Sequence, residues 1–116
     1  MSGDCVFCKI VSGEIPSNKV FENDYAVAFT DISPVAPVHL LVIPRVHVTS
    51  LAEISHSERR ERLLGHLLVV ASHVAVEHGL NENGYRLTVN QGQDAGQIVD
   101  HFHVHVLGGR RLAKIG

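Results

Sequence analysis

The sequence is poor in several features that mark specialised classes of protein. It has no tryptophan, only two cysteines among its 116 residues, and a formal net charge of −2. A nearly neutral chain gives no electrostatic reason to expect binding to nucleic acid or to an anionic membrane. In a cytosolic protein, cysteines three residues apart form a metal site or a redox pair more often than a structural disulfide. These absences leave an ordinary globular protein with neither nucleic acid nor membrane among its expected partners.

The sequence also lacks a long hydrophobic run. Its longest apolar stretch, residues 63–76, is interrupted by a glycine, a serine and two histidines. That stretch is too short and too polar to span a bilayer. The first residues lead directly into mixed sequence without the apolar segment of a signal peptide. We therefore expect the protein to lie in the cytoplasm.

The chain does contain enough apolar material for one compact domain. Apolar residues make up 45% of it, and a chain of this length buries roughly two-thirds of its unfolded surface. No repeat, low-complexity tract or linker divides the sequence. Residues 1–116 are therefore expected to form a single domain.

Hydrophobic patterning predicts an α+β fold with a mostly antiparallel sheet. A short N-terminal helix is expected over residues 6–12, capped by Asp4. A long amphipathic helix should follow a capping box made by Ser55 and Glu58. Its buried face should consist of Leu64, Leu67, Leu68, Ala71, Val74 and Ala75. Strands are expected over residues 19–22, 26–30, 39–43, 85–91 and 101–107.

Three alternating histidines dominate the last predicted strand. Side chains on a strand alternate between its two faces. His101, His103 and His105 should therefore share one face, while the apolar residues between and after them enter the core. Threonine or lysine would serve a half-buried strand equally well, so three aligned imidazoles indicate chemistry.

Two kinds of chemistry suit this arrangement. The imidazoles could bind a catalytic metal ion that activates water. They could instead act on phosphate directly, one neutral imidazole serving as nucleophile and its neighbours stabilising charge on the phosphoryl oxygens. The upstream segment from Asn90 to Gln97 contains two glycines, whose backbone amides could approach an anion. This loop favours the phosphate interpretation.

The strand sequence His-Phe-His-Val-His-Val-Leu resembles the signature of the histidine triad (HIT) superfamily. Further segments are similar to its Hint branch, the purine nucleoside phosphoramidate hydrolases: Gly108-Gly109-Arg110, Asp31-Ile32-Ser33-Pro34, His39, Leu41-Val42-Ile43-Pro44, His47 and Asn90. The matches run from about Cys5 to Arg111. The resemblance thus covers nearly the whole chain and implies a HIT-like fold.

The resemblance also implies a reaction and the residues that perform it. His103 would attack the α-phosphorus of a nucleoside 5′-phosphoramidate or related AMP conjugate. Water would then hydrolyse the covalent nucleotidyl-histidine and release a nucleoside monophosphate. His101, His105 and His39 would complete the catalytic set, His105 holding a phosphate oxygen. The purine nucleotide would contact Asp31, Ile32, Asn90, Gly96, Gln97, Phe7, Phe29 and Leu41.

Two of these implied features concern the ribose and the oligomer. Asp31 would take the ribose hydroxyls, which suits a carboxylate because it can accept two hydrogen bonds. The family further implies a homodimer, with the long helix and a strand at the interface.

Cys5 and Cys8 form a Cys-x-x-Cys pair, which in a cytosolic protein indicates a metal site or a redox pair. The pair resembles that of zinc-carrying microbial HIT proteins, whose ligands would correspond here to Cys5, Cys8, His47 and His101. A complete Cys₂His₂ set is a structural zinc site rather than a catalytic one. No organic cofactor is expected.

The sequence departs from the Hint pattern in two places. Ile98 stands where many members carry a serine or threonine, and it can donate no hydrogen bond. We expect slower turnover or a shifted leaving-group preference as a result. Residues 112–116 also lack the aromatic, proline-containing tail of animal members, so leaving-group specificity does not transfer.

Three rival functions stay open. The protein could be a nucleotide-binding adaptor that catalyses slowly, which Ile98 makes less remote. It could hydrolyse dinucleoside polyphosphates or nucleotide sugars, as sister branches do. Or it could be a metal-dependent hydrolase that uses the three histidines themselves as ligands.

Overall fold

The computed structural model describes residues 5–115. Five antiparallel strands form one sheet in the order β1-β2-β3-β5-β4. The strands are β1 (Lys19–Glu22), β2 (Ala26–Thr30), β3 (Val38–Pro44), β4 (Tyr85–Thr88) and β5 (Val104–Gly108). The helices are α1 (Val6–Ser12), α2 (Leu51–Ser55), α3 (Arg60–Glu77) and the 3₁₀ turn η1 (Gln93–Ala95). The predicted α+β fold, with a short N-terminal helix and a long later one, is confirmed.

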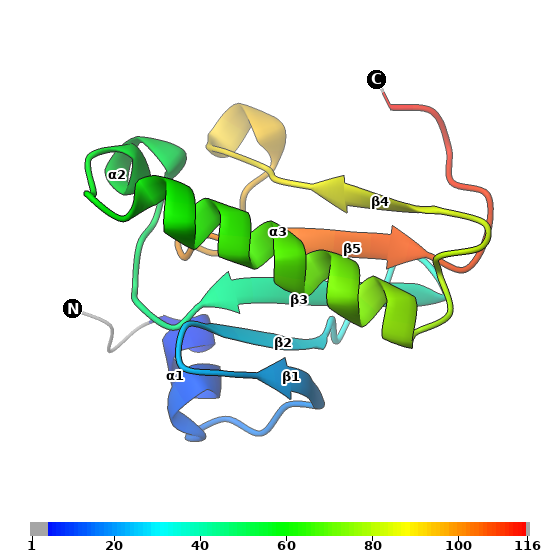
Figure 1. The fold of residues 1–116 in the computed structure, drawn as a ribbon, viewed down its shortest axis with the longest axis horizontal. Helices are drawn as coiled ribbons and strands as arrows, with labels where there is room; N and C mark the ends of the chain where they lie inside the picture. Colours follow the sequence, from blue (N-terminus) through cyan, green and yellow to red (C-terminus); the bar gives the residue numbers. More distant parts are fainter. Residues whose placement is uncertain (1–4, 116) are drawn as a thin grey trace.

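The two faces of the sheet are covered by different helices. The long helix α3 lies across one face (Figure 1), where it packs on alternate residues of the three central strands. The short helix α1 packs on the other face, where Phe7 and Ile10 meet Val27, Phe29, Leu41 and Ile43. Full burial of side chains of this size contributes about 1.5–3 kcal/mol each. No helix in residues 5–115 is long and apolar enough to cross a membrane.

A cysteine caps the start of helix α1. The Cys8 backbone N–H donates to the Cys5 Sγ at 3.2 Å, so Cys5 occupies the N-cap. The helix ends at Gly13, whose φ of +85° is a conformation that glycine adopts without steric cost. The cap expected at Asp4 falls outside the described residues. Cys5 is therefore held by local backbone geometry as well as by its partners in the cluster described below.

The capping box predicted at Ser55 and Glu58 is wrong. Ser50 is the N-cap of α2 and accepts from the Glu53 N–H at 3.0 Å, while the Glu53 carboxylate accepts from the Thr49 N–H at 2.7 Å. Helix α3 starts separately at Arg60 without a side-chain cap. The sequence carries two serine–glutamate pairs at this spacing, and a turn between α2 and α3 makes the first of them the functional cap.

The buried face of α3 is also shifted from the prediction. Leu67, Ala71, Val74 and Ala75 are buried as expected, but Leu68 is 50% exposed and Val70 is buried in its place. Both sets of positions follow the helical i, i+3, i+4 pattern, so only the packing of α3 on the sheet decides that Val70 and not Leu68 is buried.

The last two strands are shorter than predicted. Strand β5 begins at Val104 rather than His101, because continuing its register would set Phe102 opposite Pro44 of β3. Proline has no N–H to give to a ladder, and the Phe102 N–H bonds instead to the Val48 carbonyl at 2.7 Å. Strand β4 ends at Thr88, so Asn90 lies in the loop that follows it.

Candidate functional site

The three histidines occupy the face of the sheet that α1 covers. The rings of His101 and His103 form T-shaped contacts with the ring of Phe7 of α1, at centroid distances of 5.9 and 5.2 Å. The rings of His103 and His105 lie 5.0 Å apart. The intervening Phe102 and Val104 belong to the core under α3. The predicted alternation thus holds, although two of the three histidines precede the strand.

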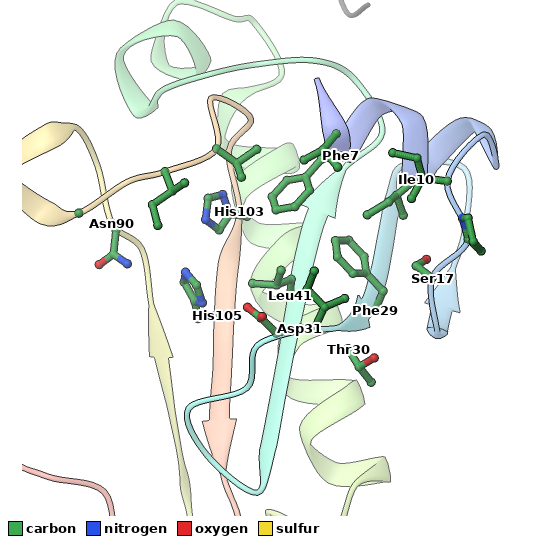
Figure 2. A pocket seen from close by; sticks show the side chains of 17 residues that line it. Phe7, Ile10, Ser17, Phe29, Thr30, Asp31, Leu41, Asn90, His103 and His105 are labelled. Carbon is green, nitrogen blue, oxygen red and sulfur yellow. The ribbon is translucent and has the colours of Figure 1, made fainter. Parts of the chain in front are cut away.

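A cavity of about 430 Å³ opens beside His103 and His105, within the size range of small-molecule sites. The two histidines lie at one end and apolar side chains from α1, β2 and β3 at the other (Figure 2). Asp31 lies between these ends. The cavity therefore has a charged or polar end and an apolar slot, which suits a ligand of the same polarity pattern.

The backbone determines which nitrogen of His103 carries the proton. Its Nδ1 lies 2.7 Å from the His101 carbonyl oxygen. A carbonyl can only accept a hydrogen bond, so Nδ1 carries the hydrogen and donates it. In the neutral ring Nε2 then has a free lone pair. His103 lines the cavity, and this nitrogen is suited to act as a nucleophile.

His105 and His39 form a second hydrogen-bonded pair. The Val35 N–H donates to His39 Nδ1 at 3.1 Å, so the neutral His39 ring carries its hydrogen on Nε2. That nitrogen lies 2.9 Å from His105 Nδ1 and 3.3 Å from Asp31 Oδ2. When His39 donates to His105, the hydrogen of neutral His105 must sit on its own Nε2. His105 therefore offers a donor to a ligand in the cavity.

Burial keeps both of these imidazoles neutral. Desolvation lowers the pKa of His105 to about 4, and the positive charges that His103 and His39 would carry push it the same way, against the Asp31 carboxylate. Desolvation also lowers the pKa of His39, and Asp31 opposes it there too. At neutral pH the 3.3 Å contact between His39 Nε2 and the Asp31 carboxylate is therefore not an ion pair.

Most of the residues predicted to hold a nucleotide line this cavity. Lining residues from that set are Phe7, Phe29, Asp31, Ile32, Leu41, Asn90 and Gly96. Ile32 is 97% exposed and stands at the rim. Gln97 is not among the lining residues; its side-chain amide accepts from the Gly92 N–H at 2.8 Å and donates to the Val99 carbonyl at 3.1 Å. Gln97 therefore stabilises the loop that contains Gly92 and Val99 without lining the cavity.

The glycine loop uses its own amides internally. The Gly96 N–H bonds to the Gln93 carbonyl at 3.0 Å, and the Gly92 N–H is taken by Gln97. These two amides are therefore not free for an anion. The Asn90 side chain, which lines the cavity (Figure 2), is the polar group that this region offers to a ligand.

Sequence reasoning missed several lining residues, Ser17 above all. Its hydroxyl oxygen is buried and has no hydrogen-bond partner among the described residues. Ser17 lies beyond Phe29 at the apolar end of the cavity (Figure 2). A buried hydroxyl without a partner costs about 1–3 kcal/mol, which makes it a group that a ligand could satisfy. No sequence signal singles out this serine, because only the tertiary packing buries it.

A separate cluster brings Cys5, Cys8, His47 and His101 together, as predicted. Their ligand atoms all lie within 4.8 Å of one another. Cys5 Sγ is 3.3 Å from His101 Nδ1, and Cys8 Sγ is 3.2 Å from His47 Nδ1. His101 donates its Nε2–H to the Pro44 carbonyl at 2.9 Å, which leaves the Nδ1 lone pair directed at the cluster. These four residues could hold a metal ion.

The same geometry bears on the rival metal-hydrolase function. His101 Nδ1 belongs to the cysteine cluster, whereas His105 groups with Asp31 and His39. In residues 5–115 the three triad histidines do not converge on one point. The structure gives no support to a metal ion held by the triad itself.

A five-stranded antiparallel sheet with three such histidines at the start of its β5 strand defines a histidine triad protein. The family model of the HIT domain matches residues 12–112. The chain belongs to the HIT family.

Known relatives agree with this assignment. The chain is 42% identical to the purine nucleoside phosphoramidase of Escherichia coli K12 over 115 residues, covering 99% of this chain and 95% of that protein. A histidine triad protein from Clostridium difficile superposes with a TM-score of 0.91 at 44% identity, over 98% of this chain and 97% of that one. A HIT family hydrolase from Legionella pneumophila gives 0.89 at 44% identity, over 95% and 96%. The prediction of a histidine triad hydrolase is confirmed.

The cluster predicts metal-dependent stability. Replacing Cys5 and Cys8 together by serine should abolish stoichiometric metal binding and lower the melting temperature, because two of four ligands are lost. Elemental analysis and calorimetry of the purified protein measure both effects, and His73→Ala, a histidine of α3 outside the cluster, is the control. Unchanged metal content in the double variant would refute the assignment.

Proposed function

We propose that this protein hydrolyses nucleoside 5′-phosphoramidates and related AMP conjugates through a covalent nucleotidyl-histidine. The observation that carries the proposal is the hydrogen bond from His103 Nδ1 to the His101 carbonyl, which leaves Nε2 free beside the cavity. The relative named purine nucleoside phosphoramidase supports this substrate class.

The reaction would take two steps at one nitrogen. In the first, His103 Nε2 bonds to the α-phosphorus, the P–N bond of the substrate breaks, and the amine leaves with a proton from water. In the second, water attacks the phosphorus and the Nε2–P bond breaks. One water molecule is consumed overall, supplying the proton on the amine and the hydroxyl on the phosphate. The neutral His105 would donate to a phosphoryl oxygen, where negative charge develops.

The cavity would orient the nucleotide along its length. The phosphate would lie at the histidine end, near Asn90. Asp31 would accept hydrogen bonds from the ribose; its Oδ1 already accepts from the Ser33 N–H at 2.8 Å, but a carboxylate has further lone pairs available. The base would enter the apolar slot, where Phe7 and Phe29 meet edge to face at 5.5 Å.

Ser17 would provide the polar contact at the far end of that slot. A hydroxyl both donates and accepts, so it can pair with an amino or a keto group on a base. This contact would give the unpartnered Ser17 oxygen the partner it lacks among the described residues.

The metal that suits the cysteine cluster is zinc, in a structural role. A zinc tetrahedron with Zn–N bonds of about 2.0 Å has an N–N edge of roughly 3.3 Å, and His47 Nδ1 lies 3.3 Å from His101 Nδ1. Burial and, after it, the neighbouring Cys5 together raise the pKa of the Cys8 thiol to about 11. A bound cation would reverse that penalty and favour the thiolates.

A homodimer through α3 and the edge strand β4 agrees with the exposed apolar residues of α3. Leu68, Val69 and Val76 are 50–66% exposed on this helix. β4 has a neighbour on one side only, and that neighbour is β5. The cytoplasmic location expected from the sequence stays a prediction.

One observation favours a second function, that of a nucleotide-binding adaptor. Ile98 lines the cavity and is 91% exposed. A large apolar side chain at the cavity mouth supplies no hydrogen bond to a leaving group, so binding could persist with slow turnover.

The proposed nucleophile is tested by AMP release from adenosine 5′-phosphoramidate and from an AMP–lysine conjugate. His103→Ala should reduce the rate by more than about 10³-fold, because removing a nucleophile removes the covalent route. His56→Ala, a surface histidine of the α2 end, should match the wild type. If the wild type binds AMP but releases none from either substrate, the result would instead support the adaptor function or a sister-branch substrate.

The role of Ser17 predicts a loss of binding without a loss of stability. Ser17→Ala should weaken AMP binding about 3–10-fold, the value of one hydrogen bond, without lowering the melting temperature. Titration calorimetry measures the affinity, with ribose 5-phosphate, which lacks a base, as the control ligand. Equal losses for both ligands, or no loss for AMP, would contradict this role.

The proposed interface predicts a dimer that one charge disrupts. The wild type should sediment at twice the mass of one chain, and Val69→Glu should shift it to the monomer because a charge would be buried at the interface. Val46→Glu places the same charge at an exposed site away from α3 and is the matched control. A monomeric wild type would exclude this interface.

A further inference from the structure

The Gly108-Gly109-Arg110 segment begins at the last residue of β5 and contributes no residue to the cavity. Its backbone passes very close to other parts of the chain. A Cβ on Gly108 would lie 2.9 Å from the Leu80 methyl groups, and one on Gly109 would lie 2.8 Å from Pro37 Cβ. Gly109 also has a φ of +95°, which disfavours any other residue. Gly108 thus lets the chain pass close to Leu80, and Gly109 lets it cross directly over the turn before β3.

Arg110 uses this close approach to bind that turn. Its Nη2 donates to the Val35 carbonyl oxygen at 2.9 Å, and its Nη1 donates to the Arg111 carbonyl at 3.0 Å. The turn between Asp31 and Val38 contains two prolines, which have no N–H to tie it to the sheet. Arg110, which is not part of this turn, therefore holds the turn in place through the Val35 carbonyl.

Val35 carries a second hydrogen bond that reaches the site. Its N–H donates to His39 Nδ1 at 3.1 Å. The carbonyl and the N–H of Val35 flank one Cα, so once the carbonyl is held, the N–H can turn away from His39 only by rotation about φ and ψ of Val35. The Val35 side chain is 64% exposed and contributes little packing to hold it.

The hydrogen bond from the Val35 N–H determines which ring nitrogen carries the hydrogen in His39 and, through it, in His105. With Nδ1 of His39 accepting, His39 Nε2 donates to His105 Nδ1 at 2.9 Å, and His105 keeps its hydrogen on Nε2. In the opposite arrangement His105 would present a lone pair to a phosphoryl oxygen and would repel it.

We propose that Arg110 is a positioning residue, which holds Val35 and so fixes the imidazole tautomers of His39 and His105. The chain of contacts runs from the guanidinium through the Val35 peptide groups to His39 and then His105. The catalytic consequence rests on the proposed function, whereas the tautomers are a property of the protein alone.

The experiment compares wild type, Arg110→Ala, Arg110→Lys and the control Arg111→Gln. Arg111 is the adjacent exposed arginine, and its guanidinium makes no hydrogen bond or ion pair within residues 5–115. Long-range ¹H–¹⁵N spectra of the histidine rings report directly which nitrogen carries the hydrogen. Turnover of adenosine 5′-phosphoramidate gives kcat and KM separately.

We expect His39 and His105 to be Nε2–H tautomers in the wild type and mixtures of tautomers in Arg110→Ala. The kcat of Arg110→Ala should fall about tenfold, because small losses of positioning are costly, while KM changes little. Arg110→Lys should recover much of both, since an ammonium can donate to the Val35 carbonyl, and Arg111→Gln should resemble the wild type.

Two results would overturn the proposal. One is unchanged tautomers of His39 and His105 in Arg110→Ala. The other is an Arg110→Lys variant that is as impaired as Arg110→Ala while melting like the wild type. A wild type that cleaves no phosphoramidate, together with tautomers that shift in Arg110→Ala, would support the positioning role and refute the proposed substrate.

Discussion

The antiparallel pairing of β3 with β5 is the constraint on which the site depends. Its register sets Leu41 opposite His105 and His39 opposite Leu107. Side chains alternate along each strand, so His39, His103 and His105 emerge on the face turned away from α3, where α1 leaves room for a cavity. A shift of one residue would turn His105 of β5 into the core. The 2.9 Å contact between His39 and His105 therefore exists only in this register.

Backbone groups then give chemically identical side chains different capabilities. The Pro44 carbonyl takes the Nε2 hydrogen of His101 and leaves its Nδ1 for a metal ion. The His101 carbonyl takes the Nδ1 hydrogen of His103 and leaves its Nε2 free. The Val35 N–H donates to His39 Nδ1, so the hydrogen of His39 lies on Nε2 and can be donated to His105. His101 also connects the two sites, because its ring faces the cysteine cluster while its carbonyl holds His103.

Much of this arrangement was predictable from the sequence, and the errors have local physical causes. The bounds of α1, β1 and β2 agree with prediction, as does the grouping of the two cysteines with His47 and His101. The cap of the helical region was misplaced because two serine–glutamate pairs share the capping spacing. The predicted strand β5 is too long because Pro44, which ends its pairing, lies on the partner strand β3. Pro44 is more than 50 residues away in the sequence, and local patterning carries no information about it.

The sequence by itself determined the family, the alternation of the histidines and the identity of the metal-ligand candidates, because these follow from residue type and from a period of two. Only the tertiary structure decided which nitrogen of each imidazole is free, that Gln97 supports its loop rather than lining the cavity, and that the Ser17 hydroxyl is buried without a partner. The reason is that hydrogen-bond direction and burial depend on backbone groups brought together from distant parts of the chain, and no local pattern records them.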